Sequence, residues 1–457
     1  MTLSERIRTG PRRWWARVAV DLDDVPDTSG FERRPPRPRW QTLALFVVVV
    51  TAAAAVAHQF RETVAIVVEW YADRSDVVEA SSSAERALVF ALVSVSVLTA
   101  AWLGLLVERR WPSATGIEAV AASARGERRR ISLRASSARA VGTGLASAGL
   151  TSIGRESAII EMGGAAGSVT GRRSGGRGDA LAAAGIAAAF AAAYHAPVAA
   201  VLYLEEHLRV ARSRRALLFS LTGALAGHLI SVHLWGAHPV FPSPGGSRWA
   251  MLGWSLAALV PAAIASRTFR WCRVRVRADA VARRLRVPRW SAVAGFALVA
   301  GAAVAIQPLA AGNGMEAMRQ AATGPTVSIA VALTVGKLIG TTASLGSGAP
   351  GGALTPTASI AAGTSVLMLL GLERLGVDAG AAVAWGVMAT SMAVGLAVGL
   401  RSPLLAIALV PELVGDYTLL PLVAVLVAVA VLVDRCLDRA VLRVSSLVPD
   451  IVYNEDG

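Results

Sequence analysis

Residues 347–356 read Ser-Gly-Ala-Pro-Gly-Gly-Ala-Leu-Thr-Pro, and residues 152–158 read Ser-Ile-Gly-Arg-Glu-Ser-Ala. Both stretches are rich in small residues, are broken by glycine or proline, and precede an apolar segment. At membrane depth, non-helical backbone is tolerated only where it is buried in protein or lines a cavity. Paired interruptions at comparable places in two halves of a chain are typical of inverted-repeat transporters with a midplane binding site. The alternative is that these glycines only let helices pack closely.

The composition places the rest of the chain in a membrane. Of the 457 residues, 54% are hydrophobic and 17% are charged, whereas a globular domain averages about 25% charged residues. Apolar runs, several of them near the roughly twenty residues that a spanning helix needs, alternate with short polar joints. The runs cover residues 41–57, 86–107, 179–204, 215–236, 249–266, 291–311, 326–345, 378–411 and 418–433. We therefore predict an all-helical polytopic membrane protein.

The net charge of +14 is carried almost entirely by arginine, because Lys337 is the only lysine in the sequence. The arginines cluster in short joints between apolar runs, where the positive-inside rule expects cytosolic residues. This distribution argues against nucleic-acid binding and predicts a multi-pass protein of the inner or plasma membrane with both termini in the cytosol. Cys272 and Cys436 lie far apart, which excludes a disulfide framework, and the six histidines show no metal-binding pattern.

The sequence divides into three parts. Residues 1–40 are polar and basic and are predicted to form a cytosolic N-terminal extension. Residues 41–447 form the predicted transmembrane domain, and residues 448–457 form a short cytosolic tail. The arginine-rich stretch 267–290 is the longest polar interruption, so we expect it to join two inverted halves. These halves cover about residues 41–266 and 290–447.

Glu156 is the first candidate functional residue, because an ionisable group at membrane depth is costly and indicates a functional site by default. It begins a helix whose N-terminal N–H groups and dipole favour negative charge. The carboxylate can therefore occupy the place of an anion, and protonation can release it. The alternative is a structural ion pair between Arg155 and Glu156. A second acidic pair ends a later apolar run: Glu205 is interpreted as an ordinary helix-end charge, and Glu206 as a candidate proton entry point.

Four motifs resemble, in order and spacing, those of the CLC family of chloride channels and proton-coupled chloride antiporters. Gly154-Arg-Glu-Ser-Ala158 resembles GREGP, and Gly348-Ala-Pro-Gly-Gly-Ala-Leu-Thr-Pro356 is similar to GxPGGxFxP. Ala191-Ala-Ala-Tyr-His-Ala-Pro-Val-Ala-Ala-Val-Leu-Tyr-Leu-Glu-Glu206 is similar to the helix AAxFNAPxxGxLFxxEE. Ala114-Thr-Gly-Ile-Glu118 resembles a degraded GSGIP. The likeness covers about residues 41–447.

The resemblance implies an inverted-repeat bundle of about seventeen or eighteen helices, many of them broken or partly spanning, in a homodimer with one pore per subunit. It also implies that helix N-termini hold chloride. Carried over by motif position, Glu156 is the external gate and proton carrier, and Glu206 is the internal proton glutamate. The anion-binding candidates that the resemblance implies are Thr115, Gly116, Ile117, Arg155, Ala353 and Leu354.

The sequence departs from the family pattern at several places. Glu118 replaces the proline of GSGIP, and Glu161 replaces a common glutamine. No tyrosine lies between Tyr417 and Tyr453, so the pore tyrosine of the family's last helix is absent. The chain ends soon after the expected last helix, so we predict no paired CBS domains. These departures put the anion preference and the proton coupling in question.

We predict anion transport, and specifically proton-coupled chloride antiport. Chloride and protons are the expected substrates, and the bilayer and a second copy of the chain are the expected partners. Two alternatives stay open: an uncoupled channel for chloride, nitrate or fluoride on the same fold, and a transport-dead homologue. No Ser/His, Asp/Asp or His-Glu-x-x-His arrangement indicates an enzyme. We therefore predict no catalytic residue, no metal and no cofactor.

Overall fold

The structure is a computed structural model, and it describes residues 39–75, 82–112, 116–126, 131–173, 178–210, 214–236 and 239–447. These residues are helical apart from their connections, and no strand occurs among them beyond one isolated bridge. The predicted all-helical class is confirmed. The predicted N-terminal extension up to residue 38 and the predicted tail 448–457 lie outside the described residues.

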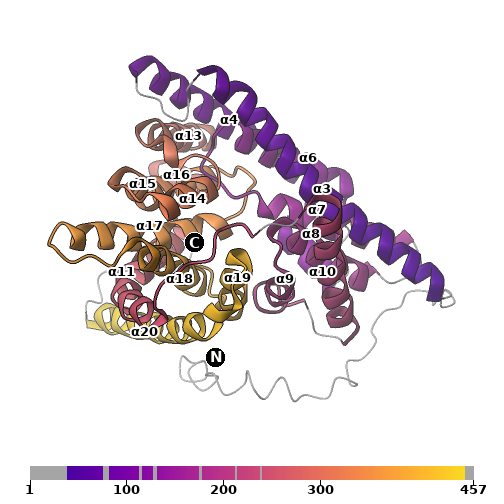
Figure 1. The fold of residues 1–457 in the computed structure, drawn as a ribbon. Coiled ribbons are helices and arrows are strands. Elements are labelled where there is room, and N and C mark those ends of the chain that lie inside the picture. Colours follow the sequence, from indigo (N-terminus) through magenta and orange to yellow (C-terminus); the bar gives the residue numbers. More distant parts are fainter. Residues whose placement is uncertain are drawn as a thin grey trace.

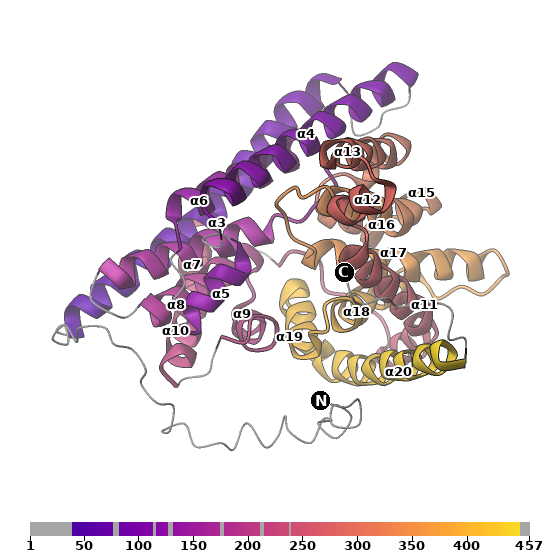
Figure 2. The same cartoon turned by 180° about the vertical axis from the view of Figure 1, so that it is seen from behind.

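The helices form two groups along the chain, which are coloured indigo to magenta and red to yellow in Figure 1 and are seen from behind in Figure 2. The first group comprises α3 (Arg39–Ser75), α4 (Ser83–Arg110), α5 (Ile117–Ala124), α6 (Leu133–Ala148), α7 (Glu156–Arg173), α8 (Gly178–Tyr194), α9 (Pro197–Leu202), the π-helical turn η2 (Tyr203–His207) and α10 (Arg214–Trp235). The second comprises α11 (Arg248–Arg275), α12 (Ala278–Leu285), α13 (Arg289–Ile306), η3 (Pro308–Ala310), α14 (Met315–Thr323), α15 (Val327–Val331), η4 (Ala332–Gly336), α16 (Lys337–Gly346), α17 (Leu354–Glu373), α18 (Ala381–Gly399), α19 (Pro403–Val414), η5 (Tyr417–Leu419) and α20 (Leu420–Leu447).

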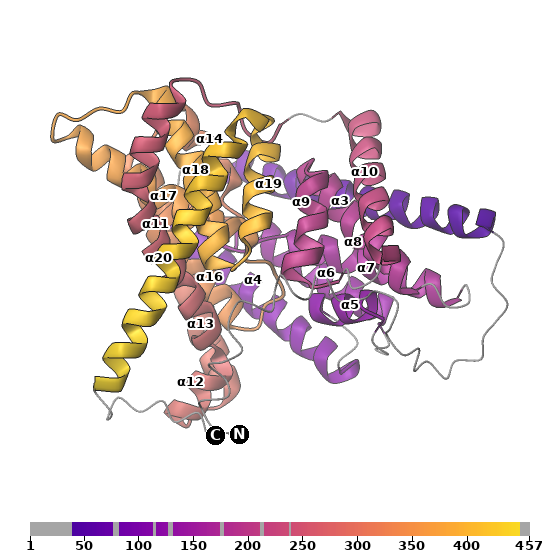
Figure 3. The ribbon, with the colours of Figure 1, turned by 90° about the horizontal axis from the view of Figure 1, so that it is seen from below.

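Two kinds of contact hold the groups together. Helix α4 packs on α6 of the first group and on α13 of the second, and α19 packs on α9. The second contact is clearest from below, where α9 and α19 lie side by side between the two groups (Figure 3). Helices α9 and α19, which begin at Pro197 and Pro403, therefore meet at the middle of the molecule.

Nine helices of the described residues are long and apolar enough to cross a membrane. Helix α10 shows how such a helix is oriented. Its Leu218, Leu221 and Leu225 side chains are exposed, whereas Gly223 and Gly227 face α8, where an added Cβ would lie 2.6 Å from a backbone oxygen in each case. Small residues at helix interfaces allow such close approach in membranes, while leucine is compatible with lipid.

Helices α8 and α18 form the interior of the two groups. Every residue of α8 from Ala180 to Tyr194 is buried, and so is every residue from Trp385 to Leu400 around α18. Alanine and glycine dominate α8, so its neighbours α3, α7 and α10 can approach it closely. A helix that is apolar on all sides is buried in this way.

Three segments differ from their appearance in the sequence. The apolar run 179–204 is divided between α8 and α9 at His195, and the run 378–411 is divided between α18 and α19 at Arg401; both residues have positive φ, of 55° and 56°. The stretch 267–290, which we expected to be a polar joint, is mostly helical, because α11 continues to Arg275 and α12 follows. In each run, one polar residue followed two positions later by proline marks the break, and a proline disfavours helix at the residue before it, so apolar character alone does not show where the helix ends.

Candidate functional site

The two broken segments that the sequence singles out meet in space. Gly154 N–H donates to Gly352 O over 2.9 Å, and Gly352 N–H donates to Gly154 O over 2.8 Å. The two glycines form an isolated antiparallel bridge. A side chain on Gly154 has no room, because its Cβ would lie 2.7 Å from Gly352 O. The paired stretches are therefore one structure, in which glycine is needed for the close approach of two backbones.

Glu156 lies directly beside this bridge. It is the first residue of α7, and only 5% of its surface is exposed. The Thr355 hydroxyl, on the second residue of α17, donates a hydrogen bond to Glu156 Oε1. Oε2 has no hydrogen-bond partner among the described protein atoms and packs against Gly154 and Gly352. The carboxylate thus fills a small buried space at the N-terminal ends of α7 and α17, which favour negative charge.

A chain of buried side chains connects this carboxylate with η2. Tyr194, the last residue of α8, has its hydroxyl 3.1 Å from Thr355 Oγ1. The Tyr194 ring lies 5.0 Å from the Phe190 ring, which lies 4.9 Å from Tyr203. Tyr203 stacks on His207 at 5.1 Å. Hydroxyl contacts through Thr355 and ring contacts from Tyr194 onward therefore connect Glu156 with His207 at the other end of α9.

The second part of the chain supplies the predicted backbone donors at the start of α17. Ala353 is the N-cap residue and Leu354 is the first helical residue. Ala353 has no side chain that caps the helix, so the polar groups near this end are backbone amides and the Thr355 hydroxyl. Arg155, the remaining candidate next to Glu156, is half-buried. The structure brings these residues together around Glu156.

The backbone N–H of Gly116, before α5, is not open to an anion, because it already has a hydrogen-bond partner. Gly116 has a φ of 92° and precedes Ile117, the first residue of α5. The Gly116 N–H already donates to Glu161 Oε1 over 2.8 Å, and Glu161 Oε2 accepts from Arg139 Nε over 3.2 Å. An anion at Gly116 has to displace that buried carboxylate. Thr115 lies outside the described residues.

The glutamates near the middle of the molecule cap each other's helices. Glu206 accepts hydrogen bonds from the backbone N–H groups of Leu404 and Leu405, at 3.1 and 2.9 Å, and so caps the start of α19. Glu412, at the end of α19, accepts bonds of 3.0 and 2.8 Å from the first turn of α9. Each glutamate follows the proline that begins its own helix by nine residues. Glu206 therefore has both carboxylate oxygens occupied by a structural contact.

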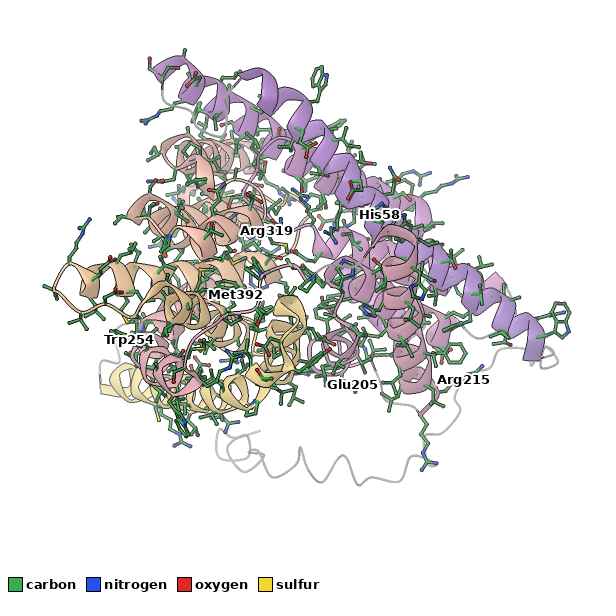
Figure 4. The ribbon with its side chains drawn as sticks, in the orientation of Figure 1. His58, Glu205, Arg215, Trp254, Arg319 and Met392 are labelled. Atoms are coloured by element: carbon green, nitrogen blue, oxygen red, sulfur yellow. The ribbon has the colours of Figure 1, made fainter. Side chains whose placement is uncertain are left out.

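Glu205 has a different environment. Its Oε1 is buried and has no hydrogen-bond partner among the described protein atoms. Figure 4 labels this residue beside α9. The turn η2 lies outside the nine candidate spans, and burial raises the pKa of Glu205 to about 7. A carboxyl group with such a pKa can take up and release a proton near neutral pH.

A cavity of about 540 Å³ opens beside η2. Its lining includes the ionisable residues Glu118, Arg125, Glu206, His207, Arg209 and Arg401. The acid that replaces the family's proline, Glu118, therefore faces the same cavity as Glu206. His207 Nδ1 lies 3.1 Å from Ser402 Oγ, so the imidazole joins η2 to the start of α19.

Four residues with contacts at the site were not among the sequence candidates: Tyr194, Lys337, Thr355 and Glu412. Two of these residues are unusual in the sequence and could have been singled out from it. Tyr194 stands where the family motif has phenylalanine, and Lys337 is the only lysine. Thr355 and Glu412 are not unusual, because an isolated threonine or a glutamate at a helix end is common, and only folding brings them to Glu156 and to α9.

Comparisons with known proteins give the family and the fold of this chain. The family described as voltage gated chloride channel matches residues 96–435, about three quarters of the chain. Over 285 residues the chain is 27% identical to the voltage-gated ClC-type chloride channel ClcB of Citrobacter koseri, a match of 59% of this chain. It spans 66% of the length of that relative.

Solved structures share the fold. A slow cyanobacterial Cl⁻/H⁺ antiporter is similar with a TM-score of 0.70 and 22% identity, over 88% of this chain and 95% of its own. A CLC-type fluoride/proton antiporter is similar with a TM-score of 0.69 and 20% identity, over 87% and 97%. At such low sequence identity, the likeness to these two structures shows a shared fold and nothing more. With the family match over most of its length and a helical fold to go with it, the chain belongs to the voltage-gated chloride channel (CLC) family.

Proposed function

We propose that this protein is a proton-coupled anion antiporter, with chloride as the default substrate. The Glu156 carboxylate carries the proposal, because it is buried at the start of α17 and accepts a hydrogen bond from Thr355. An anion and this carboxylate have the same charge and compete for the same donors, so only one of them binds at a time. Protonation neutralises Glu156 and releases it, and an anion then enters. Proton uptake and anion entry are thereby linked.

The anion contacts follow from this exchange. Once Glu156 has left, the backbone amides of Ala353 and Leu354 and the Thr355 hydroxyl face the vacated space. Thr115, Gly116 and Ile117 are proposed to contact the anion from the α5 side, after Glu161 has released the Gly116 N–H. Arg155 contributes positive charge beside the gate. Binding by helix N-termini and hydroxyl groups is strong enough for selectivity and weak enough for release.

The similar solved structures include a Cl⁻/H⁺ antiporter and a fluoride/proton antiporter. Both of these proteins are proton-coupled, which favours coupling here, and they transport two different anions. Fluoride is therefore the second anion to be tested. Absence of tyrosine from residues 418–452 favours the other candidate function, an uncoupled channel, because a pore hydroxyl that constrains the anion is lacking.

The wild-type protein in liposomes is expected to move chloride and protons in opposite directions. A chloride gradient directed outward should drive protons into the lumen and acidify it, even against a proton gradient, as recorded with a chloride electrode and a pH electrode together. Protein-free liposomes are the control. Chloride efflux without proton movement would establish the channel instead, and absence of flux for chloride, nitrate and fluoride would establish the transport-dead alternative.

Proton exchange at the η2 end is proposed to involve the acidic pair. The motif position assigns it to Glu206, but the contacts favour Glu205. Burial raises the pKa of both carboxyl groups, but both Glu206 oxygens cap α19, whereas Glu205 has an unpartnered buried oxygen and a pKa of about 7. We assign proton transfer to Glu205 and the helix cap to Glu206, at the side of the membrane that the arginine-rich joints predict to be cytosolic.

Replacing Glu205 by glutamine is expected to lower chloride-driven proton flux by about tenfold or more, because a glutamine cannot carry a proton. Glu206→Gln is the matched variant. It keeps one acceptor for the cap and should retain coupling, with a melting temperature a few degrees lower, in line with a cap worth about 1 kcal/mol. Loss of coupling in Glu206→Gln with normal coupling in Glu205→Gln would return the proton role to Glu206.

The membrane location, the orientation and the oligomeric state of the protein are proposed from the same features. Apolar helices and family membership make it a multi-pass membrane protein. We propose the inner or plasma membrane, cytosolic termini, and a homodimer with one pore per subunit. The clustering of arginine in short joints supports the orientation.

A further inference from the structure

A cavity of about 790 Å³ opens between the start of α6 and the end of α7. These two helices pack on each other. The residues that line the cavity include Ser132, Leu133, Arg134 and Ser137 from the α6 side, and Val169 and Arg172 from α7. Two arginines and two serines therefore share the cavity with apolar side chains, and none of the described lining residues is acidic.

This cavity lies at the other end of α7 from Glu156. Helix α7 begins at Glu156 and continues to Arg173. Since a helix rises about 1.5 Å per residue, Arg172 is roughly 24 Å from Glu156 along the helix axis. The arginine-rich joint 125–134 leads into α6, and the positive-inside rule places such a joint at the cytosolic surface. The cavity is therefore separate from the proposed anion path.

The polar groups of the cavity are donors that suit a phosphate. Arg172 Nη2 donates to Ile131 O over 2.8 Å, which fixes this guanidinium at the wall between the two helices. Arg134, in the first turn of α6, is exposed and lines the same cavity. Ser132 Oγ accepts from Ala135 N–H over 3.3 Å, and its hydroxyl can still donate. Guanidinium groups bind phosphate oxygens through charge-assisted hydrogen bonds.

An exposed apolar face of α6 continues from the cavity. Val141 and Leu145 follow Arg134 by seven and eleven residues, so the three share one side of the helix. Val141 is 56% exposed and Leu145 is 45% exposed. The other side of α6 faces protein, because the Thr143 hydroxyl donates to Pro350 O over 3.0 Å. In a membrane protein, such an exposed apolar face is compatible with lipid chains.

We propose that this cavity binds the phosphate group of an anionic phospholipid. Arg134 and Arg172 contact the phosphate from the two helices, and an acyl chain lies against Val141 and Leu145. Basic pockets between membrane helices bind anionic head groups in this way. A soluble phosphate would leave the apolar face uncovered. A zwitterionic lipid fits less well, because its ammonium group would face two guanidinium groups.

The test is lipid binding to the purified full-length protein in detergent, measured by native mass spectrometry during titration with phosphatidylglycerol. Wild-type protein should bind phosphatidylglycerol at least ~5-fold more tightly than phosphatidylcholine with the same acyl chains. Arg134→Gln and Arg172→Gln should each weaken phosphatidylglycerol binding about fivefold, the size expected for one basic residue beside an anionic lipid.

Arg109→Gln is the matched control. Arg109 is exposed in the last turn of α4, which packs on α6, but it does not line the cavity. Its replacement removes the same charge nearby and should leave binding at the wild-type value. Because Arg172→Gln also removes the bond to Ile131 O, the exposed Arg134 decides the result if Arg172→Gln does not fold. Arg134→Lys keeps the charge and should bind more tightly than Arg134→Gln.

Two further measurements separate a lipid from a soluble phosphate. Leu145→Asn should weaken phosphatidylglycerol binding roughly threefold, because it removes apolar contact with the chain. Glycerol 1-phosphate, which has the phosphate without acyl chains, should bind much more weakly than the lipid.

Three results would each overturn the proposal. Equal binding of phosphatidylglycerol and phosphatidylcholine would show that the cavity does not select an anionic head group. An equal loss in Arg109→Gln and Arg134→Gln would show only a general attraction of basic residues to anionic lipid. Tight binding of glycerol 1-phosphate, with no effect of Leu145→Asn, would show a site for a soluble phosphate instead.

Discussion

Replacing Glu156 by alanine is expected to reduce proton transport to the level of protein-free liposomes while anion efflux continues. The carboxylate is the group that competes with an anion at the start of α17, and alanine neither carries a proton nor fills that space. Anion efflux should therefore lose its dependence on pH. The measurement is chloride efflux and proton uptake, recorded together at several pH values.

The control for this variant is Glu316→Ala. Glu316 lies on α14, its side chain is 70% exposed, and it pairs with Arg319 one turn away. An exposed pair of this kind contributes little, so both fluxes should match wild type. Persistent chloride uptake driven by a pH gradient in Glu156→Ala would contradict the gate assignment and leave Glu156 as a partner of Arg155 in a structural ion pair.

Replacing Gly352 by alanine is expected to force the gate open without removing its carboxylate. The new methyl group would overlap Glu156 Oε2, which is the far end of a flexible side chain, and the next contact is an ordinary 3.4 Å from Ser157 N. The side chain can therefore leave while the Gly154–Gly352 bridge stays. Anion efflux should become nearly independent of pH, and proton coupling should fall about tenfold, as if the gate could no longer close.

Gly154→Ala is the matched variant on the other side of the bridge. Its methyl group would also overlap Glu156 Oε2, but it would lie 2.7 Å from Gly352 O and 2.9 Å from Gly352 C as well. Backbone cannot move aside as a side chain can, and such overpacking costs roughly 1–3 kcal/mol. This variant should lose stability in a thermal-unfolding assay. Normal pH dependence in a well-folded Gly352→Ala protein would show that the carboxylate does not need this space.

The sequence and the structure agree most closely where a residue type has a single physical use. Glycine-broken stretches with a charged residue inside an apolar protein indicate a site, and the structure joins the two stretches through Gly154 and Gly352. Other features could not be interpreted from the sequence alone. Glu205 and Glu206 are adjacent and chemically identical, so only their partners distinguish a free carboxyl group from a helix cap.

Tertiary structure also assigned contacts to residues that looked ordinary. Thr355 is one hydroxyl among many small residues of α17, yet it is the group that donates to Glu156. The replacement of glutamine by Glu161 was visible in the sequence, but its bond to Gly116 N–H was not. Such contacts join segments far apart in the chain, and no local pattern in either segment records the partner.

The sequence by itself determined that this protein lies in a lipid membrane, that it is all-helical, and that it resembles the CLC family. Long apolar runs require lipid, broken glycine-rich stretches require burial, and four motifs in order indicate the CLC fold. Only the tertiary structure decided which acid is held at the start of α17 and which acid caps α19. The physical reason is that hydropathy and backbone preference are properties of neighbouring residues, whereas the protonation and binding roles of a buried side chain depend on the atoms that folding places around it.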